Sequence, residues 1–303
     1  MPGAWVARRF YAPGVTEARI ATQSWKVGAA TITSVVEDQV DGPPGLLFPD
    51  ATEELVQRHP WLVPDYADAA GGIALRVQAF VVEIDGITVL VDPCVGNGKA
   101  RWLPAWNELD LPFLERLADA GFTPPDVELV VHTHLHADHV GWDTHRDGDA
   151  WVPTFTQARH LYTEAELEFV RTWLLPGEDV YGDSIAPIVE AGLADVVEPD
   201  ADLGHGMRLE PTPGHTPGHT SMWIESEGEH ALITGDFMHH PVQFAEPQLA
   251  EIADADVDGA RVTRARMLRE MARTRALVLG THFPSRPAGR VEADGDVWRF
   301  VAE

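Results

Sequence analysis

The sequence predicts an α/β (α+β) layer architecture, in which helices cover β-sheets. Short apolar runs of strand length alternate along the chain with longer stretches that repeat apolar residues every three or four positions. No low-complexity linker and no internal repeat divides the 303 residues. We therefore expect one domain over residues 1–303, with residues 1–70 as an N-terminal extension packed on it.

The clearest strand signal is a β-hairpin. Residues 75–84 form an extended, largely apolar run, Asp85-Gly86 is a typical two-residue turn, and residues 87–91 form a second run. Further short apolar runs predict strands at residues 127–131, 231–234 and 276–279.

Helical periodicity appears at residues 111–120, 164–174 and 260–275. The arginines of the third stretch, from Arg261 to Arg275, predict a solvated helix face. Residues 41–68 are rich in proline and predict an irregular surface crossing, with a position at the mouth of a pocket as the alternative.

The composition limits the classes of partner that this protein is expected to bind. The formal net charge of −26 opposes long-range attraction to nucleic acid or to an anionic membrane. Cys94 is the only cysteine, so the chain forms no internal disulfide and no thiolate cluster, and we expect an inert buried thiol. No apolar run has the length of a membrane span. We expect a cytoplasmic protein with a small-molecule substrate, no nucleic acid and no membrane partner; a homodimer stays open.

One short segment concentrates metal-capable side chains after an apolar run. It reads Val131-His132-Thr133-His134-Leu135-His136-Ala137-Asp138-His139-Val140-Gly141. Residues two apart in an extended chain point to the same side, so His134 and His136 can share one metal, while a turn at Ala137 aims Asp138 and His139 at another. Imidazole and carboxylate ligands suit zinc, iron, manganese or cobalt.

Three later segments carry ligand-type residues. Residues 212–219 repeat the unit Thr-Pro-Gly-His, whose proline and glycine fix a tight turn. Two apolar runs, at residues 232–236 and 277–282, reach a glycine shortly before Asp236 and His282. Both patterns are typical of strand ends.

These four segments resemble, in chain order, the ligand segments of the metallo-β-lactamase superfamily, beginning with its H-x-H-x-D-H motif at residues 134–139. The resemblance covers residues 75–282. It implies a four-layer αββα sandwich with two sheets packed face to face, helices outside, and a site at one edge of the sandwich.

The same resemblance implies a two-metal hydrolase with two divalent ions, zinc first and manganese, iron or cobalt as alternatives. One ion would take His134, His136 and His215, and the other Asp138, His139 and His282. Asp236 would bridge them. A hydroxide between the ions would be the nucleophile, and Asp138 or Asp236 could pass a proton to the leaving group.

Nearby side chains receive separate interpretations. His132 precedes the motif and is structural, and His219 supports its turn. His239 or His240 could reach the substrate and hold a developing oxyanion, and we assign His239 a catalytic role. Five apolar residues flank ligand segments and predict either a substrate pocket or ordinary core: Trp142, Trp151, Phe237, Met238 and Phe244.

Within the superfamily, the chain is similar to the branch of lactonases and of organophosphate or aryl-ester hydrolases. Exported β-lactamases generally lack a carboxylate like Asp236, and flavodiiron proteins carry glutamate where His136 stands. Thioesterases of the glyoxalase II kind and RNA-processing nucleases would carry further regions. We expect hydrolysis of a lactone or carboxylic ester, with a phosphotriester second and a mononuclear iron dioxygenase or a non-catalytic metal-dependent sensor below these. Lactonases of this branch often have tyrosine at the position of His239, which leaves the homoserine lactone assignment open.

Overall fold

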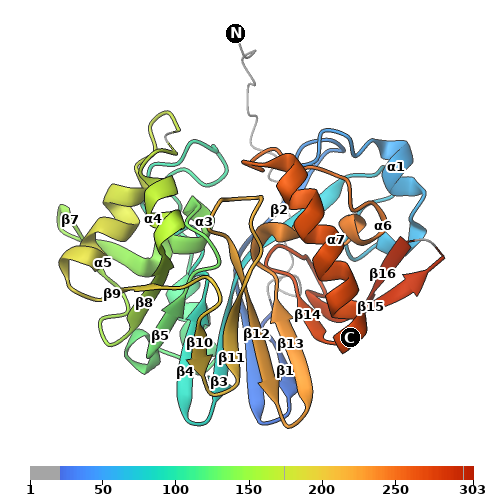
Figure 1. The fold of residues 1–303 in the computed structure, drawn as a ribbon. Coiled ribbons are helices and arrows are strands. Elements are labelled where there is room, and N and C mark those ends of the chain that lie inside the picture. Colours follow the sequence, from blue (N-terminus) through green and yellow to red (C-terminus); the bar gives the residue numbers. More distant parts are fainter. Residues whose placement is uncertain (1–20, 174, 296) are drawn as a thin grey trace.

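The computed structural model describes residues 21–173, 175–295 and 297–303. Over these residues, two seven-stranded β-sheets pack face to face and helices cover their outer faces (Figure 1). The four-layer αββα sandwich expected from the sequence is confirmed.

The first sheet has the order β1-β2-β3-β4-β5-β8-β9. Its strands are β1 Gln23–Val27, β2 Ala30–Gly42, β3 Ile73–Ile84, β4 Ile87–Val91, β5 Leu129–Val131, β8 Arg159–Thr163 and β9 Ala194–Val197. Neighbours are antiparallel from β1 to β4 and parallel from β4 to β9.

The second sheet has the order β10-β11-β12-β13-β14-β15-β16. Its strands are β10 Asp202–Gly204, β11 Met207–Pro211, β12 Thr220–Ser226, β13 Glu229–Ile233, β14 Leu277–Leu279, β15 Ala288–Asp294 and β16 Val297–Ala302. β13 and β14 are parallel. A separate hairpin joins β6 Thr144–Asp147 to β7 Ala150–Pro153.

The α-helices are short except for the last. They are α1 Glu53–Gln57, α2 Phe113–Asp119, α3 Ala137–Val140, α4 Glu164–Val170, α5 Ala186–Glu190, α6 Val242–Ala245 and α7 Val257–Thr274. In Figure 1, α3, α4 and α5 lie on one side of the sheets, and α6 and α7 lie on the other.

Successive side chains of a strand point to opposite faces of its sheet, so the core is divided among the interfaces of the sandwich. Ile233 of β13 and Val91 of β4 belong to the apolar cluster between the sheets. Their neighbours Leu232 and Leu90 point to the opposite faces, where Leu232 packs in the cluster under α7 and Leu90 in the cluster under α2. The strand period of two thus gives both sheets two buried faces.

Most predicted elements are confirmed with shifted ends. β3 and β4 form the expected hairpin, with Asp85 and Gly86 at positive φ of 52° and 83° in its turn. Helices at 113–119 and 257–274 and strands at 129–131, 229–233 and 277–279 match their predicted segments. The helix predicted at 164–174 was too long, because α4 ends at Val170; Leu174 lies outside the described residues.

Two predictions about exposure were confirmed only in part. Residues 41–68 are not only a surface crossing, because Phe48 and Leu62 are fully buried in the cluster under α7. The apolar residues between the prolines cover the second sheet. Arg264 is also fully buried within the helix face predicted to be solvated. It donates to the carbonyl oxygens of Phe237, Pro247 and Leu249, which come from two segments that pack against α7.

Residues 23–42 supply β1 and β2 of the first sheet. The single-domain interpretation stays a prediction, and residues 1–20 of the predicted N-terminal extension lie outside the described residues. Among the helices that the structure describes, none combines the length and the apolar character of a membrane span.

Candidate metal centre

The seven predicted ligand residues meet at one end of the two sheets. From the first sheet, the loop after β5 carries His134 and His136, and α3 carries Asp138 and His139. From the second sheet, the loop after β11 carries His215, the 3-10 turn after β13 carries Asp236, and His282 follows β14. The site therefore lies between the layers at their shared edge.

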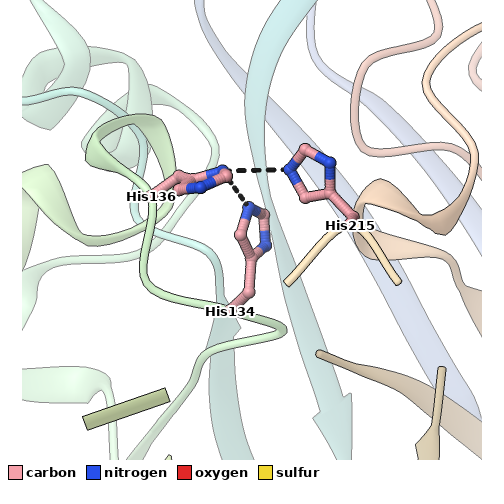
Figure 2. A group of neighbouring side chains, drawn as sticks. All are labelled: His134, His136 and His215. Atoms are coloured by element: carbon pink, nitrogen blue, oxygen red, sulfur yellow. Dashed lines mark hydrogen bonds between the residues drawn. The ribbon is translucent and has the colours of Figure 1, made fainter. Parts of the chain in front are cut away.

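The first triad consists of His134, His136 and His215 (Figure 2). The Nδ1 atom of His136 lies 3.1 Å from His134 Nε2 and 2.9 Å from His215 Nε2. Three ring nitrogens that converge this closely cannot all satisfy one another by hydrogen bonds, because each neutral ring has one donor. One cation can accept all three lone pairs, so the triad fits a metal ion.

The second triad consists of Asp138, His139 and His282. The Nε2 atoms of His139 and His282 are 3.3 Å apart, and Asp138 Oδ2 lies 3.7 Å from the first and 3.5 Å from the second. This set offers two imidazoles and one carboxylate, which also suits a divalent cation.

Asp236 lies between the triads. Its Oδ2 atom is 3.7 Å from His134 Nε2 and 3.6 Å from His215 Nε2 in the first triad. The same atom is 3.2 Å from Nε2 of both His139 and His282 in the second. Oδ1 of Asp236 is buried without a hydrogen-bond partner among the described residues, so the carboxylate has one oxygen shared by both triads and one spare acceptor.

Acceptors behind the rings fix the ligand orientation. His215 Nδ1 donates to Asp254 Oδ1 at 3.1 Å, and His282 Nδ1 donates to the Arg76 carbonyl oxygen at 2.7 Å. His139 Nδ1 lies 3.0 Å from Asp92 Oδ2. A donor proton held at Nδ1 leaves the Nε2 lone pairs of these rings facing the centre, where a cation could accept them.

The two triads differ in charge. Burial, followed by repulsion from neighbouring imidazoles, lowers the pKa of His134, His136 and His215 well below the ordinary 6.5. Burial acts in the same direction on His282, but the Asp236 and Asp138 carboxylates outweigh it and raise its pKa to about 9. The first triad therefore presents neutral rings, whereas a cation in the second would replace a proton.

His239 and His240 occupy different environments. His239 Nε2 lies 3.1 Å from Asp236 Oδ2, and its backbone N–H donates to Gln243 Oε1. His240 turns away, since Nε2 donates to the Tyr66 carbonyl and Nδ1 accepts the Val242 N–H. Of the two rings proposed to reach substrate, the geometry supports His239.

His132 and His219, the two remaining histidines of the ligand segments, support the scaffold. His132 Nε2 lies 2.9 Å from Asp143 Oδ2 and its Nδ1 donates to the Leu161 carbonyl. His219 Nε2 accepts the Asp236 N–H at 2.7 Å, and its Nδ1 donates to Thr212 Oγ1. These contacts agree with the structural roles that the sequence suggested.

The five flanking apolar residues mostly form core. Phe237, Met238 and Phe244 pack under α7 and Trp142 packs under α2, while Trp151 lies beneath the Lys99 ammonium. Sequence reasoning missed Trp173, which is half-buried with its ring centroid 5.5 Å from that of His136.

Sequence reasoning also missed Asp92 and Asp254, the carboxylates behind the rings of His139 and His215. Asp92 directly follows β4 in the Val91-Asp92-Pro93 segment, and a carboxylate at a strand end beside the motif's strand was the available signal. Asp254 has no comparable signal.

Comparison with known proteins agrees with this centre. The family profile described as "Metallo-beta-lactamase superfamily" matches residues 72–282. The N-acyl homoserine lactonase AiiB of Agrobacterium fabrum (strain C58 / ATCC 33970) is 31% identical over 171 residues, 47% of this chain and 61% of that protein. The N-acyl homoserine lactonase of Bacillus thuringiensis is 28% identical over 161 residues, 50% of this chain and 58% of that protein. The match thus spans only about three fifths of these relatives.

Solved structures resemble the whole fold. The hydrolase AbOPH aligns with a TM-score of 0.75 and 25% identity over 93% of this chain and 97% of that one. AidC, a dizinc quorum-quenching lactonase, aligns with a TM-score of 0.77 and 19% identity over 95% and 99%. An αββα sandwich with a histidine and aspartate centre at its edge defines a class of metalloprotein. This chain belongs to the metallo-β-lactamase superfamily.

Proposed function

We propose that this chain is a binuclear metal-dependent hydrolase that opens a small-molecule lactone or cleaves a carboxylic ester. The observation that carries the proposal is the position of Asp236, whose Oδ2 lies within 3.7 Å of Nε2 in His134, His139, His215 and His282. One carboxylate oxygen shared by both triads is what a pair of neighbouring cations needs. The names of the curated relatives support the lactone.

The chain's residues would hold the ions in two places. His134, His136 and His215 would hold the first, Asp138, His139 and His282 the second, and Asp236 both. When bound, two zinc ions would supply Lewis acidity and lower the pKa of a water molecule into the neutral range. Manganese, iron and cobalt suit the same ligands.

His239 is the side chain best placed to act on the substrate. Its Nε2 is 3.1 Å from the shared Asp236 oxygen, and its Nδ1 is buried with no hydrogen-bond partner among the described residues. The ring N–H of His239 can donate to a carbonyl oxygen as negative charge develops on it. Asp138 and Asp236 are the carboxylates that can return a proton to the leaving alkoxide.

Apolar groups flank the centre on two sides. Trp173 lies against His136 of the first triad. The Phe48 ring, which is fully buried, meets His239 edge-on with centroids 6.3 Å apart. Trp173 therefore offers half-buried apolar surface beside His136, which suits the acyl or aryl part of an ester, and Phe48 packs behind His239.

The function is tested by proton release from a panel of substrates. Zinc- or manganese-loaded protein is mixed at matched concentrations with a lactone series, aryl carboxylic esters and a phosphotriester. The proposal expects rapid release from lactones or carboxylic esters that a chelator abolishes. Release from the phosphotriester alone would contradict the substrate class. No release with two metals bound, or oxygen uptake with one iron, would contradict hydrolysis.

His239→Ala separates binding from turnover. The variant should keep both metals and lose about 10²- to 10³-fold in turnover, the usual effect of removing one oxyanion donor. Turnover equal to that of the unchanged protein would remove His239 from the mechanism.

A further inference from the structure

Glu166 is a buried carboxylate that the mechanism does not use. It is the third residue of α4 and is only 2% exposed. Its Oε2 atom accepts the backbone N–H of Leu135 at 3.0 Å, and its Oε1 atom accepts the backbone N–H of Gly218 at 2.8 Å. Both carboxylate oxygens are thus occupied by backbone donors from outside the helix.

These two donors belong to the two loops that build the first triad. Leu135 lies between His134 and His136 in the loop that follows β5 of the first sheet. Gly218 lies three residues after His215 in the loop that follows β11 of the second sheet. One side chain therefore joins two loops from different sheets, and the triad needs both.

The junction is tightly packed. Thr163 Oγ1 donates to the Gly218 carbonyl at 3.1 Å. A Cβ on Gly218 would lie 2.7 Å from Thr163 Oγ1 and 2.8 Å from the Glu166 backbone nitrogen. The loop that contains Gly218 thus meets the start of α4 with no room for a side chain. A change in the Glu166 carboxylate would therefore shift this loop.

The second triad is held by other means. His139 faces Asp92, and His282 donates to the Arg76 carbonyl oxygen. His282 follows β14, and Asp138 and His139 lie on α3; neither Leu135 nor Gly218, the two donors to Glu166, belongs to these elements. Any effect of Glu166 on metal binding should consequently fall on one ion more than on the other.

We propose that Glu166 is a positioning residue that fixes the separation of His136 and His215 and thereby sets the affinity of the first metal position. The inference rests on the proposed two-metal centre. Charged hydrogen bonds from a carboxylate to backbone N–H groups are about twice as strong as neutral ones, so this residue can hold two loops that carry neutral imidazole ligands.

The test is stepwise zinc removal from Glu166→Gln by a competing chelator. A glutamine oxygen can keep one N–H, but its NH2 group faces the other, so one of the two bonds is lost. The variant should release one zinc equivalent about 10- to 100-fold more readily, the usual effect of losing a group that orients a ligand, and release the other as the unchanged protein does. Excess zinc should restore turnover. Glu168→Gln, at an exposed position of the same helix, is the matched control.

His215→Ala identifies which equivalent is affected. This substitution removes one ligand of the first triad, so Glu166→Gln should change nothing further in the equivalent that remains. Thr163→Val, a milder change at the same junction, should weaken the same equivalent to a smaller degree and serves if Glu166→Gln does not fold.

The outcomes separate the two proposals. Fewer than two zinc ions in the unchanged protein would overturn the two-metal centre itself. Two ions there, with unchanged release from Glu166→Gln or Thr163→Val, would overturn the positioning role alone. Equal weakening of both equivalents together with a lower melting temperature would also overturn it, since that is the result expected of a purely structural residue.

Discussion

The Thr-Pro-Gly-His unit occurs twice in succession, at residues 212–215 and 216–219, and its two copies do different things. His215 of the first copy turns Nε2 to His136 Nδ1 and Nδ1 to Asp254. His219 of the second copy uses both ring nitrogens within the scaffold, accepting the Asp236 N–H and donating to Thr212. The same four residues provide a candidate ligand once and a support for another candidate ligand once.

The difference lies in what surrounds each copy. The first copy projects beyond β11 toward the loop from the other sheet, and an acidic residue stands behind its ring. The second leads into β12, so its ring lies beneath the turn that carries Asp236. A repeated motif therefore fixes a local backbone shape, while the neighbouring strands decide the chemistry of its side chain.

The largest expected effect comes from His215→Ala. Loss of one of three ligands should empty the first metal position and lower turnover about 10³-fold or more, because the two ions act as a unit. Zinc content by atomic absorption and steady-state kinetics measure both. Retention of two tightly bound ions would contradict the role given to the first copy.

His219→Ala should instead act on the fold. It leaves the buried Asp236 N–H without an acceptor and opens a cavity, which together cost about 4 kcal/mol of unfolding free energy. Denaturant unfolding of metal-free proteins checks this, and His215→Ala should be clearly more stable in the same assay. Equal stabilities would erase the distinction between the copies.

How well the site could be predicted also depends on whether a residue's role follows from its own strand or from a neighbouring one. All seven candidate ligand residues stood out in the sequence because they gather at strand ends, four of them within residues 134–139. Asp92 reaches Thr133 and His139 only because β4 pairs with β5, which places Val91 beside Val131. That pairing is a tertiary event, so the strand-end position of Asp92 does not show which side chains it meets.

Burial was harder to predict than chemistry. Arg264 looked like one of several surface arginines because the loop carbonyls it serves are distant in the sequence. Residues 41–68 looked like a surface crossing because of their prolines, yet Phe48 lies next to His239. In both cases, the partner that decides exposure comes from another part of the chain.

His240 provides a comparison outside both copies. Burial lowers its pKa from the ordinary 6.5 to about 4, as it does for His219. Because the folded pKa is below the unfolded one, the stability that the neutral ring provides is present above pH 6.5 and is lost as the pH falls toward 4. The loss should be about 3 kcal/mol for His240.

This acid sensitivity is measured by unfolding metal-free protein at pH 7.5 and pH 4. His240→Gln can keep bonds to Tyr66 and Val242 without titrating, so its unfolding free energy should fall by about 3 kcal/mol less than that of the unchanged protein. An identical fall in both proteins would show that His240 does not titrate in this range.

The smallest expected effect is the difference in stability between substitutions of Gly214 and Gly218, the glycines of the two Thr-Pro-Gly-His copies. Gly214 has a φ of 136°, and a Cβ there would lie 2.2 Å from the Ala260 backbone nitrogen. Gly218 has no such backbone restriction, although a Cβ would crowd Thr163 and Glu166. Gly214→Ala should therefore lower the unfolding free energy by about 1–2 kcal/mol more than Gly218→Ala. Denaturation curves of the two variants decide this, and the reverse order would contradict the account of the turns.

The central claim is that two triads share Asp236 and hold two metal ions. Anomalous scattering from a crystal of the zinc-loaded protein tests it directly. The account predicts two zinc peaks, one among His134, His136 and His215 and one among Asp138, His139 and His282, with the Asp236 carboxylate between them. A single peak, or two peaks of which neither contacts Asp236, would contradict it.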